Sequence, residues 1–177
     1  MSKKTRNLTA SDVLEILAWL EAAEVEIWLD GGWGHDALLG EQTRRHDDLD
    51  LVIDMEDCRR LIDALAQHGF EVTEQDSPNA FVLTDSGGRQ VDVHAAHFDE
   101  AGNASYRMRN GEEWIFPADG LGGEGRIAGR PARCMTAELQ MRCKTGNFEP
   151  TAVDYHDVRL LNARFGVAIP EMYRHRA

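Results

Sequence analysis

The sequence predicts an α+β fold in which a small mixed sheet packs on helices and further helices end the chain. Short segments that alternate apolar and polar residues, as half-buried strands do, are interspersed with segments of helical periodicity. The last part of the chain carries only helical patterns. At 177 residues, of which 42% are hydrophobic, the chain is long enough for essentially one folding unit, and it shows no internal repeats.

The first two predicted elements are a helix and a strand. Apolar residues fall at helical spacing after the capping segment 9–12, which predicts a helix that ends near Ala23. Residues 25–30 then alternate with the period of a half-buried strand, and the pair Gly31-Gly32 closes it.

A second helix and a second strand follow this glycine pair. Residues 33–39 indicate a short helix that Gly40 stops, and residues 48–53 alternate again as a strand. Asp54 can cap a third helix, for which Gly69 supplies the left-handed C-terminal position.

Three more strands are predicted, at residues 70–73, 80–84 and 89–94. The segment 85–88 has the turn chemistry of a hairpin and joins the last two of them. After about Glu100 glycines stand among few apolar residues, so we expect loops and a short hairpin around residues 127–134.

Two helices are predicted to end the chain. One starts at Thr136 and ends by Gly146. The other runs from about residue 153, places Phe165 on its inner face, and ends at Gly166.

Composition limits the partners that the chain can have. A net charge of -12 argues against binding to nucleic acid through its phosphates and favours a small substrate, which can be cationic. The basic N-terminal segment lacks the apolar core of a signal peptide, and no apolar run reaches transmembrane length. The three cysteines lack the spacing of a zinc site or a disulfide framework. We therefore expect a cytoplasmic protein with reduced thiols and no membrane partner.

Carboxylates on two of the predicted strands carry the functional interpretation. Because side chains alternate along a strand, Asp48 and Asp50 project from one face while the aliphatic residues turn into the core. Two carboxylates so close together need a compensating cation, and their oxygens suit Mg²⁺. Asp92 and His94 share one face of a second strand. If the two strands are neighbours, three carboxylates converge and can hold two magnesium ions.

Two other features flank these acids in the sequence. Gly31 and Gly32 stand between a strand and a helix, where the backbone can approach a phosphate and the helix N-terminus can supply N–H donors. Arg44, Arg45 and His46 precede the first acid pair and can contact a triphosphate. A double glycine or a loop of mixed charge alone is weak evidence, so both assignments depend on the acids.

Residues 28–40 read WLDGGWGHDALLG, and residues 43–50 read TRRHDDLD. Together they resemble the lincosamide nucleotidyltransferases and are also similar to the aminoglycoside 2''-nucleotidyltransferases. Both belong to the DNA polymerase beta-like nucleotidyltransferase superfamily. The resemblance runs from the first helix to about Phe165. It implies that residues 1–100 form the catalytic core and that residues 101–177 form a hairpin and helical region that completes the acceptor site.

The same resemblance implies roles for individual residues. Asp48 and Asp50 correspond to metal ligands, and Asp92 corresponds to a further ligand or the general base. The phosphate-facing and triphosphate-binding positions are matched by Gly31, Gly32, Arg44 and His46. ATP is the implied donor, and lincomycin or clindamycin is the implied acceptor. Two departures are the long gap between the glycine pair and the acids, and His35 at a position expected to be apolar.

Three alternatives stay open at this point. An aminoglycoside acceptor is favoured by the acidic balance, whereas the segment 91–94 (VDVH) favours the lincosamide branch. A metal-dependent phosphohydrolase could be built from Asp48, Asp50, His46, His94 and His97. A non-catalytic relative would be expected to lack one of the acids, and none is missing. The oligomeric state, with a homodimer as one option, and the roles of His35, His94 and Lys144 are left undecided.

Overall fold

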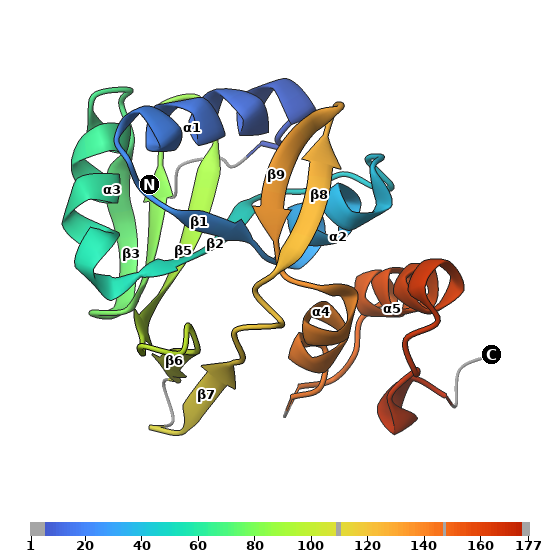
Figure 1. Cartoon of the computed structure of the whole chain (residues 1–177). Helices are drawn as coiled ribbons and strands as arrows, with labels where there is room; N and C mark the ends of the chain where they lie inside the picture. The colour runs from blue at the N-terminus through green and yellow to red at the C-terminus, as the bar shows by residue number, and fades with distance from the viewer. Residues whose placement is uncertain (1–5, 109–110, 147, 175–177) are drawn as a thin grey trace.

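Within residues 6–108, 111–146 and 148–174, which the computed structural model describes, a nine-stranded mixed sheet organises the chain (Figure 1). Seven strands follow the order β3-β4-β5-β2-β1-β9-β8, while β6 pairs with β5 and β7. The strands are β1 Ile27–Leu29, β2 Leu49–Asp54, β3 Glu71–Ser77, β4 Ala80–Thr84, β5 Gln90–Phe98, β6 Ala104–Arg107, β7 Glu113–Phe116, β8 Gly123–Ile127 and β9 Arg130–Cys134. The helices are α1 Ala10–Ala22, α2 Gly31–Leu39, α3 Cys58–Ala66, α4 Ala137–Cys143 and α5 Ala152–Phe165, with short 3-10 helices η1 Met55–Asp57 and η2 Glu171–Tyr173.

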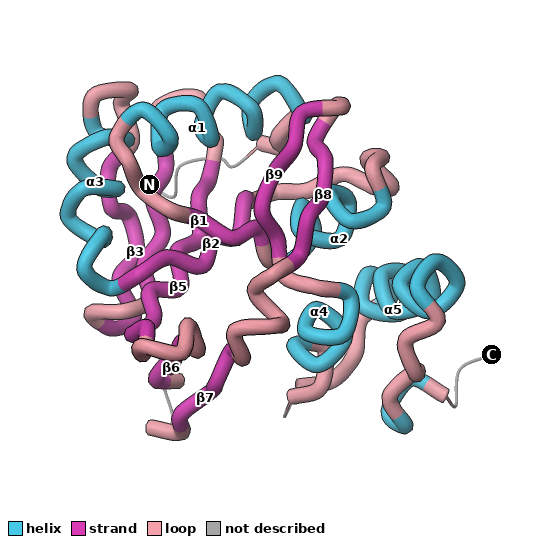
Figure 2. Tube along the Cα trace, viewed as in Figure 1, coloured by secondary structure: helices cyan, strands magenta, loops and turns pink. Residues whose placement is uncertain are grey.

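The helices lie around the strands (Figure 2). Helix α1 begins at a capping box in which Thr9 and Asp12 bond to each other's backbone N–H groups, as segment 9–12 predicts. Together with α3 it covers one face of the sheet and encloses the main hydrophobic core (Figure 1). In the described ranges, no helix combines the length and the apolar character that crossing a bilayer requires.

Strand β2 has a different environment on each face. Leu49, Leu51 and Ile53 are fully buried in the main core. Val52, on the opposite face with Asp50, is buried in a second apolar cluster that includes residues from β6, β7 and α4. Asp50 therefore faces the side of the sheet that the later part of the chain covers.

Most predicted elements are confirmed, with shifted bounds. The second strand, the third helix and the hairpin of β4 and β5 lie where the patterns place them, but Asp54 caps the short helix η1 and not α3 itself. Strand β1 is shorter than residues 25–30, and helix α2 begins at Gly31, so the glycine pair forms its first turn. Gly40 takes the predicted left-handed position, with φ of 76°.

Two predictions for the later part of the chain need correction. The hairpin of β6 and β7 stands where the sequence predicted loops. The inward position of Phe165 was wrong, since this side chain is 40% exposed. Helix α5 contributes Val158 and Leu161 to a small cluster that Tyr173 closes, and this cluster does not extend to Phe165.

The sheet continues across residue 100. The predicted hairpin of β8 and β9 exists, and β9 pairs with β1 in parallel. Helices α4 and α5 pack against each other and against α2 (Figure 1). The division into regions 1–100 and 101–177 stays a prediction about function, because both parts contribute to one sheet.

Candidate metal and nucleotide site

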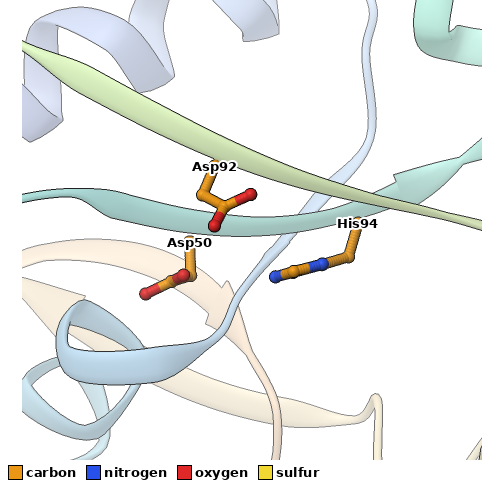
Figure 3. Close-up of side chains that lie close together, drawn as sticks. All are labelled: Asp50, Asp92 and His94. Carbon is orange, nitrogen blue, oxygen red and sulfur yellow. The ribbon is translucent and has the colours of Figure 1, made fainter. Parts of the chain in front are cut away.

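Three side chains that could hold a cation converge on the second face of the sheet. Strands β2 and β5 are parallel neighbours, and their register places Asp50 opposite Asp92. Ligand atoms of Asp50, Asp92 and His94 all lie within 4.8 Å of one another, and the three side chains lie close together on the neighbouring strands β2 and β5 (Figure 3). The prediction that Asp92 lies beside Asp50 is therefore confirmed.

Asp48 lies at the edge of this group. It directly precedes β2, and its oxygens are not part of the set of three within 4.8 Å. Its charge nevertheless helps to raise the pKa of Asp50. Burial raises the pKa of Asp48 itself, with Asp47 acting in the same direction. The structure thus brings Asp50 and Asp92 together, while Asp48 lies outside the set of three and acts on both through its charge.

The acids repel one another when no cation is bound. Burial raises the pKa of Asp50 well above its ordinary value, and the charges of Asp48, Asp30 and Asp92 add to this effect. Burial also raises the pKa of Asp92, although His94 opposes the shift. Nδ1 of His94 is buried without a hydrogen-bond partner in the described residues. Burial and mutual repulsion disfavour the ionised carboxylates, and a bound cation would offset both effects. Carboxylate oxygens are the hard ligands that Mg²⁺ prefers, so the residues present fit this ion.

The two glycines at the start of α2 are required by close packing. A Cβ atom on Gly31 would lie 2.0 Å from Oδ2 of Asp50, and one on Gly32 would lie 2.1 Å from Nδ1 of His46. Gly31 also has φ of 56°, in the left-handed region. Its N–H group donates to Oδ1 of Asp30, at 2.7 Å. The phosphate-facing role of the two glycines stays a prediction. The structure adds a packing role, because the absence of a Cβ atom at these positions leaves room for the side chains of Asp50 and His46.

Arg44 takes part in an ion-pair cluster with the C-terminal helices. Its Nε and Nη2 atoms donate to the two oxygens of Asp157, each at 2.9 Å. Lys144 Nζ lies 3.2 Å from Oδ2 of Asp157, one of these two oxygens, and 3.0 Å from Oδ1 of Asp154. Two cations therefore lie side by side on one buried carboxylate. Burial alone would raise the pKa of Asp157, but the hydrogen bonds from Arg44 and the charges nearby lower it to about 2.

This cluster gives a stability prediction. Asp157→Asn is expected to lower the free energy of unfolding by about 3 to 5 kcal/mol at neutral pH, because it leaves two part-buried cations without their shared counter-charge. The folded-state pKa is depressed from 3.8 to about 2, so the contribution of Asp157 is present at neutral pH and is lost as pH falls through this interval. Denaturant unfolding at a series of pH values measures it, and a constant difference between wild type and variant down to the acid limit would contradict this account.

His46 has a supporting position. It is only 3% exposed, its Nε2 atom pairs with the carboxylate of Asp36, and its ring packs against Trp33. Asp36 also accepts hydrogen bonds from the N–H and hydroxyl groups of Thr43. His46 thus fixes the loop before β2 against α2. A triphosphate contact by His46 stays an untested prediction, and the buried ring argues for an indirect role.

The histidines do not gather as a phosphohydrolase would require. In the described residues His94 is the histidine that joins the acids within 4.8 Å. His97 is exposed near the far end of β5, where it pairs with Ser105 of β6. The geometry therefore favours a centre built mainly on carboxylates.

A cavity of about 710 Å³ adjoins the acids. Tyr106, Trp114 and Phe116 of the β6–β7 hairpin line one part of it, and another part is lined by residues at and after the end of α4, namely Cys143, Thr145, Gly146 and Phe148. Asp30 and His94 also line it, and since His94 lies beside Asp50 and Asp92, the cavity reaches the candidate metal position. The sequence patterns missed this cavity because they missed the hairpin.

Comparisons with known proteins match most of the chain. The family model described as aminoglycoside-2''-adenylyltransferase covers residues 12–161. A lincosamide resistance protein of Staphylococcus haemolyticus is 28% identical over 160 residues, which are 90% of this chain and 98% of that protein. A 2''-aminoglycoside nucleotidyltransferase of Klebsiella pneumoniae is 34% identical over 125 residues, which are 70% of this chain and 66% of that protein.

Solved structures share the fold. The lincosamide antibiotic adenylyltransferase LnuA, crystallised with lincomycin bound, matches with a TM-score of 0.79 and 27% identity over 89% of this chain and 99% of LnuA. The enzyme ANT(2")-Ia has the same fold, with a TM-score of 0.67 and 24% identity over 87% of each chain. These matches confirm the α+β nucleotidyltransferase fold and the resemblance seen in the sequence. The chain belongs to the aminoglycoside-2''-adenylyltransferase family of nucleotidyltransferases.

Proposed function

We propose that the protein transfers a nucleoside monophosphate, with ATP as the preferred donor, to a hydroxyl group of a lincosamide antibiotic such as lincomycin or clindamycin. Such a transfer would confer resistance to the drug. The observation that carries the proposal is the cavity beside Asp50, Asp92 and His94, whose size suits a drug-sized acceptor and which reaches residues that could hold a metal. Similarity to a lincosamide resistance protein along nearly the whole of both chains supports this acceptor.

Asp48, Asp50 and Asp92 would hold two magnesium ions in this proposal. Bound there, Mg²⁺ supplies positive charge to the triphosphate and to the departing pyrophosphate. Asp92 accepts the proton of the acceptor hydroxyl as that oxygen forms a bond to the α phosphorus. The bond from the α phosphorus to the bridging oxygen of the β phosphate breaks, and the products are the nucleotidylated drug and pyrophosphate.

Cationic and glycine residues would hold the phosphates. Gly31 and Gly32 would present the N-terminus of α2, and Arg44 would contact the triphosphate while Asp157 fixes its guanidinium group. His46 would support that loop from beneath. In this proposal residues 1–100 supply the catalytic groups, and residues 101–177 complete the acceptor site. We further infer a cytoplasmic protein that acts on small molecules, without nucleic-acid or membrane partners, and a homodimer is compatible with this role.

Aminoglycoside 2''-nucleotidyl transfer is the second candidate. The relative from Klebsiella pneumoniae, at 34% identity, favours it, and so do the carboxylates of the cavity, because aminoglycosides carry several amines. The aromatic wall of Tyr106, Trp114 and Phe116 favours the less polar lincosamide instead. A panel of nucleoside triphosphates and antibiotics, read by mass for addition of one nucleoside monophosphate, decides between them. Addition to tobramycin but not to lincomycin would overturn the proposed acceptor.

Metal removal gives a further prediction. Transfer should require added Mg²⁺ or Mn²⁺ and stop in the presence of a chelator. Three carboxylates without thiolates offer only hard oxygen ligands, and such a site holds its metal ion weakly. Elemental analysis of the purified protein with activity assays across metals tests this. Stoichiometric zinc that survives purification, together with activity indifferent to magnesium, would instead support a hydrolase.

A further inference from the structure

Several carboxylates line the cavity. Among them, Asp30 is the one whose position in the chain and the sheet brings it nearest to the candidate metal ligands. It directly follows β1, and its backbone N–H donates to the carbonyl of Asp50 at 3.0 Å. Its charge acts on both Asp50 and Asp92. It is nevertheless absent from the set of ligand atoms within 4.8 Å that Asp50 and Asp92 form with His94. Asp30 therefore lines the cavity and lies near the candidate metal ligands without belonging to their set.

The Asp30 side chain is fixed by one oxygen and leaves the other available. As N-cap of α2, its Oδ1 atom accepts the N–H of Gly31 at 2.7 Å, which orients the carboxylate. Oδ2 accepts no hydrogen bond and forms no ion pair with any residue that the structure describes. A pre-oriented carboxylate oxygen at the wall of a cavity is a strong acceptor for a ligand hydroxyl or ammonium group.

The rest of the cavity shows what kind of ligand would meet this oxygen. Aromatic side chains of the β6–β7 hairpin provide apolar lining, and Arg142 stacks on Trp114 with 4.6 Å between guanidinium carbon and ring centroid. Glu112 and Glu113 add negative charge, and the described lining residues include no lysine or arginine. A cavity of this kind suits an amphipathic molecule that carries hydroxyl groups and a positive charge.

We propose that Asp30 binds the acceptor: its Oδ2 atom accepts a hydrogen bond from a hydroxyl group next to the one that attacks, on a polyhydroxylated, amphipathic ligand. This inference rests on the proposed function and extends it to regiochemistry. Because Asp30 is anchored to the backbone of both β2 and α2, it holds the acceptor in a fixed register relative to Asp92. The hydrogen bond between Asp30 and the hydroxyl group next to the attacking one then determines which oxygen of the acceptor reaches the α phosphorus.

Asp30→Asn tests the role without removing the helix cap, since asparagine is an equally good N-cap residue. The variant should lower kcat/KM for lincomycin about 10- to 100-fold, the effect of losing one hydrogen bond to a charged group. Lincomycin binding by calorimetry should weaken, ATP binding should stay unchanged, and the product should become a mixture of regioisomers by tandem mass spectrometry. Asp30→Gly, which keeps an acceptable cap and removes the carboxylate, should behave in the same way.

Asp54→Asn is the matched control. Asp54 also ends a strand and caps the next helix, with Oδ1 accepting the N–H of Glu56 at 3.0 Å, but it stands at the opposite end of β2 from Asp50. It should transfer like wild type. Wild-type kinetics and a single product from both Asp30 variants, or an equal loss of ATP binding, would overturn the assignment. If wild type modifies another acceptor and not lincomycin, the proposed function has failed, and the same variants are compared with that acceptor.

Discussion

Asp50→Asn is expected to nearly abolish nucleotidyl transfer while the fold survives. Removal of one neutral hydrogen-bond donor from a developing charge typically lowers the rate about 10²- to 10³-fold. The loss of rate in Asp50→Asn should be larger, because the substitution removes a charged ligand of Mg²⁺. The fold should survive because asparagine is isosteric and the β2 side chains of the main hydrophobic core lie on the opposite face. Turnover with saturating Mg²⁺ and the melting temperature should be measured on the same preparation.

The metal-free melting temperature makes this prediction sharper. Burial and the charges of Asp48, Asp30 and Asp92 disfavour the ionised form of Asp50, so the neutral amide should leave the metal-free protein as stable as wild type or more stable. Stabilisation by added Mg²⁺ and nucleotide should be smaller in the variant. Asp54→Asn, at the other end of the same strand, serves as control. A folded Asp50→Asn protein that retains near wild-type turnover would remove the proposed metal site.

Asp92→Asn should lower the chemical step more than nucleotide binding. Asp92 lies opposite Asp50 in the sheet and beside His94, which lines the proposed acceptor cavity. General bases typically contribute about 10²- to 10⁴-fold, which sets the expected loss in single-turnover rate. Because that contribution arises mainly in the transition state, it should appear in kcat and much less in ATP affinity.

Two measurements separate these effects. Calorimetry with a non-reactive ATP analogue reports binding, and rapid-quench transfer to lincomycin reports the chemical step. An unchanged single-turnover rate in Asp92→Asn would require a different base. A loss of ATP affinity as large as the loss of rate would make Asp92 chiefly a metal ligand.

The sequence alone predicted the parts of the site that depend on local patterns. Alternation along β2 and β5 placed Asp50 and Asp92 each on the face opposite the side chains of the main core, and the register of parallel neighbours then brought them together. The caps at Thr9, Thr136 and Gly40 were also readable, because capping is decided within a few residues.

The parts that escaped sequence reasoning depend on long-range packing. Arg44 and Asp157 are separated by 113 positions, and no local pattern pairs them. Strands β6 and β7 have four residues each, and their order comes from packing of Ala104 and Phe116 against Val52 and α4. The acceptor cavity, and with it the place of Asp30, became visible only when that hairpin was positioned.

The central claim is that the α phosphorus of a triphosphate, with its nucleoside, moves to an antibiotic hydroxyl. Parallel reactions with Mg²⁺, lincomycin, and ATP labelled at either the α or the γ phosphorus test it most directly. We predict that α label appears in the drug and that γ label leaves as pyrophosphate, in equal amounts and only when the drug is present. Label from the γ position in the drug, or orthophosphate released without any acceptor, would contradict the account.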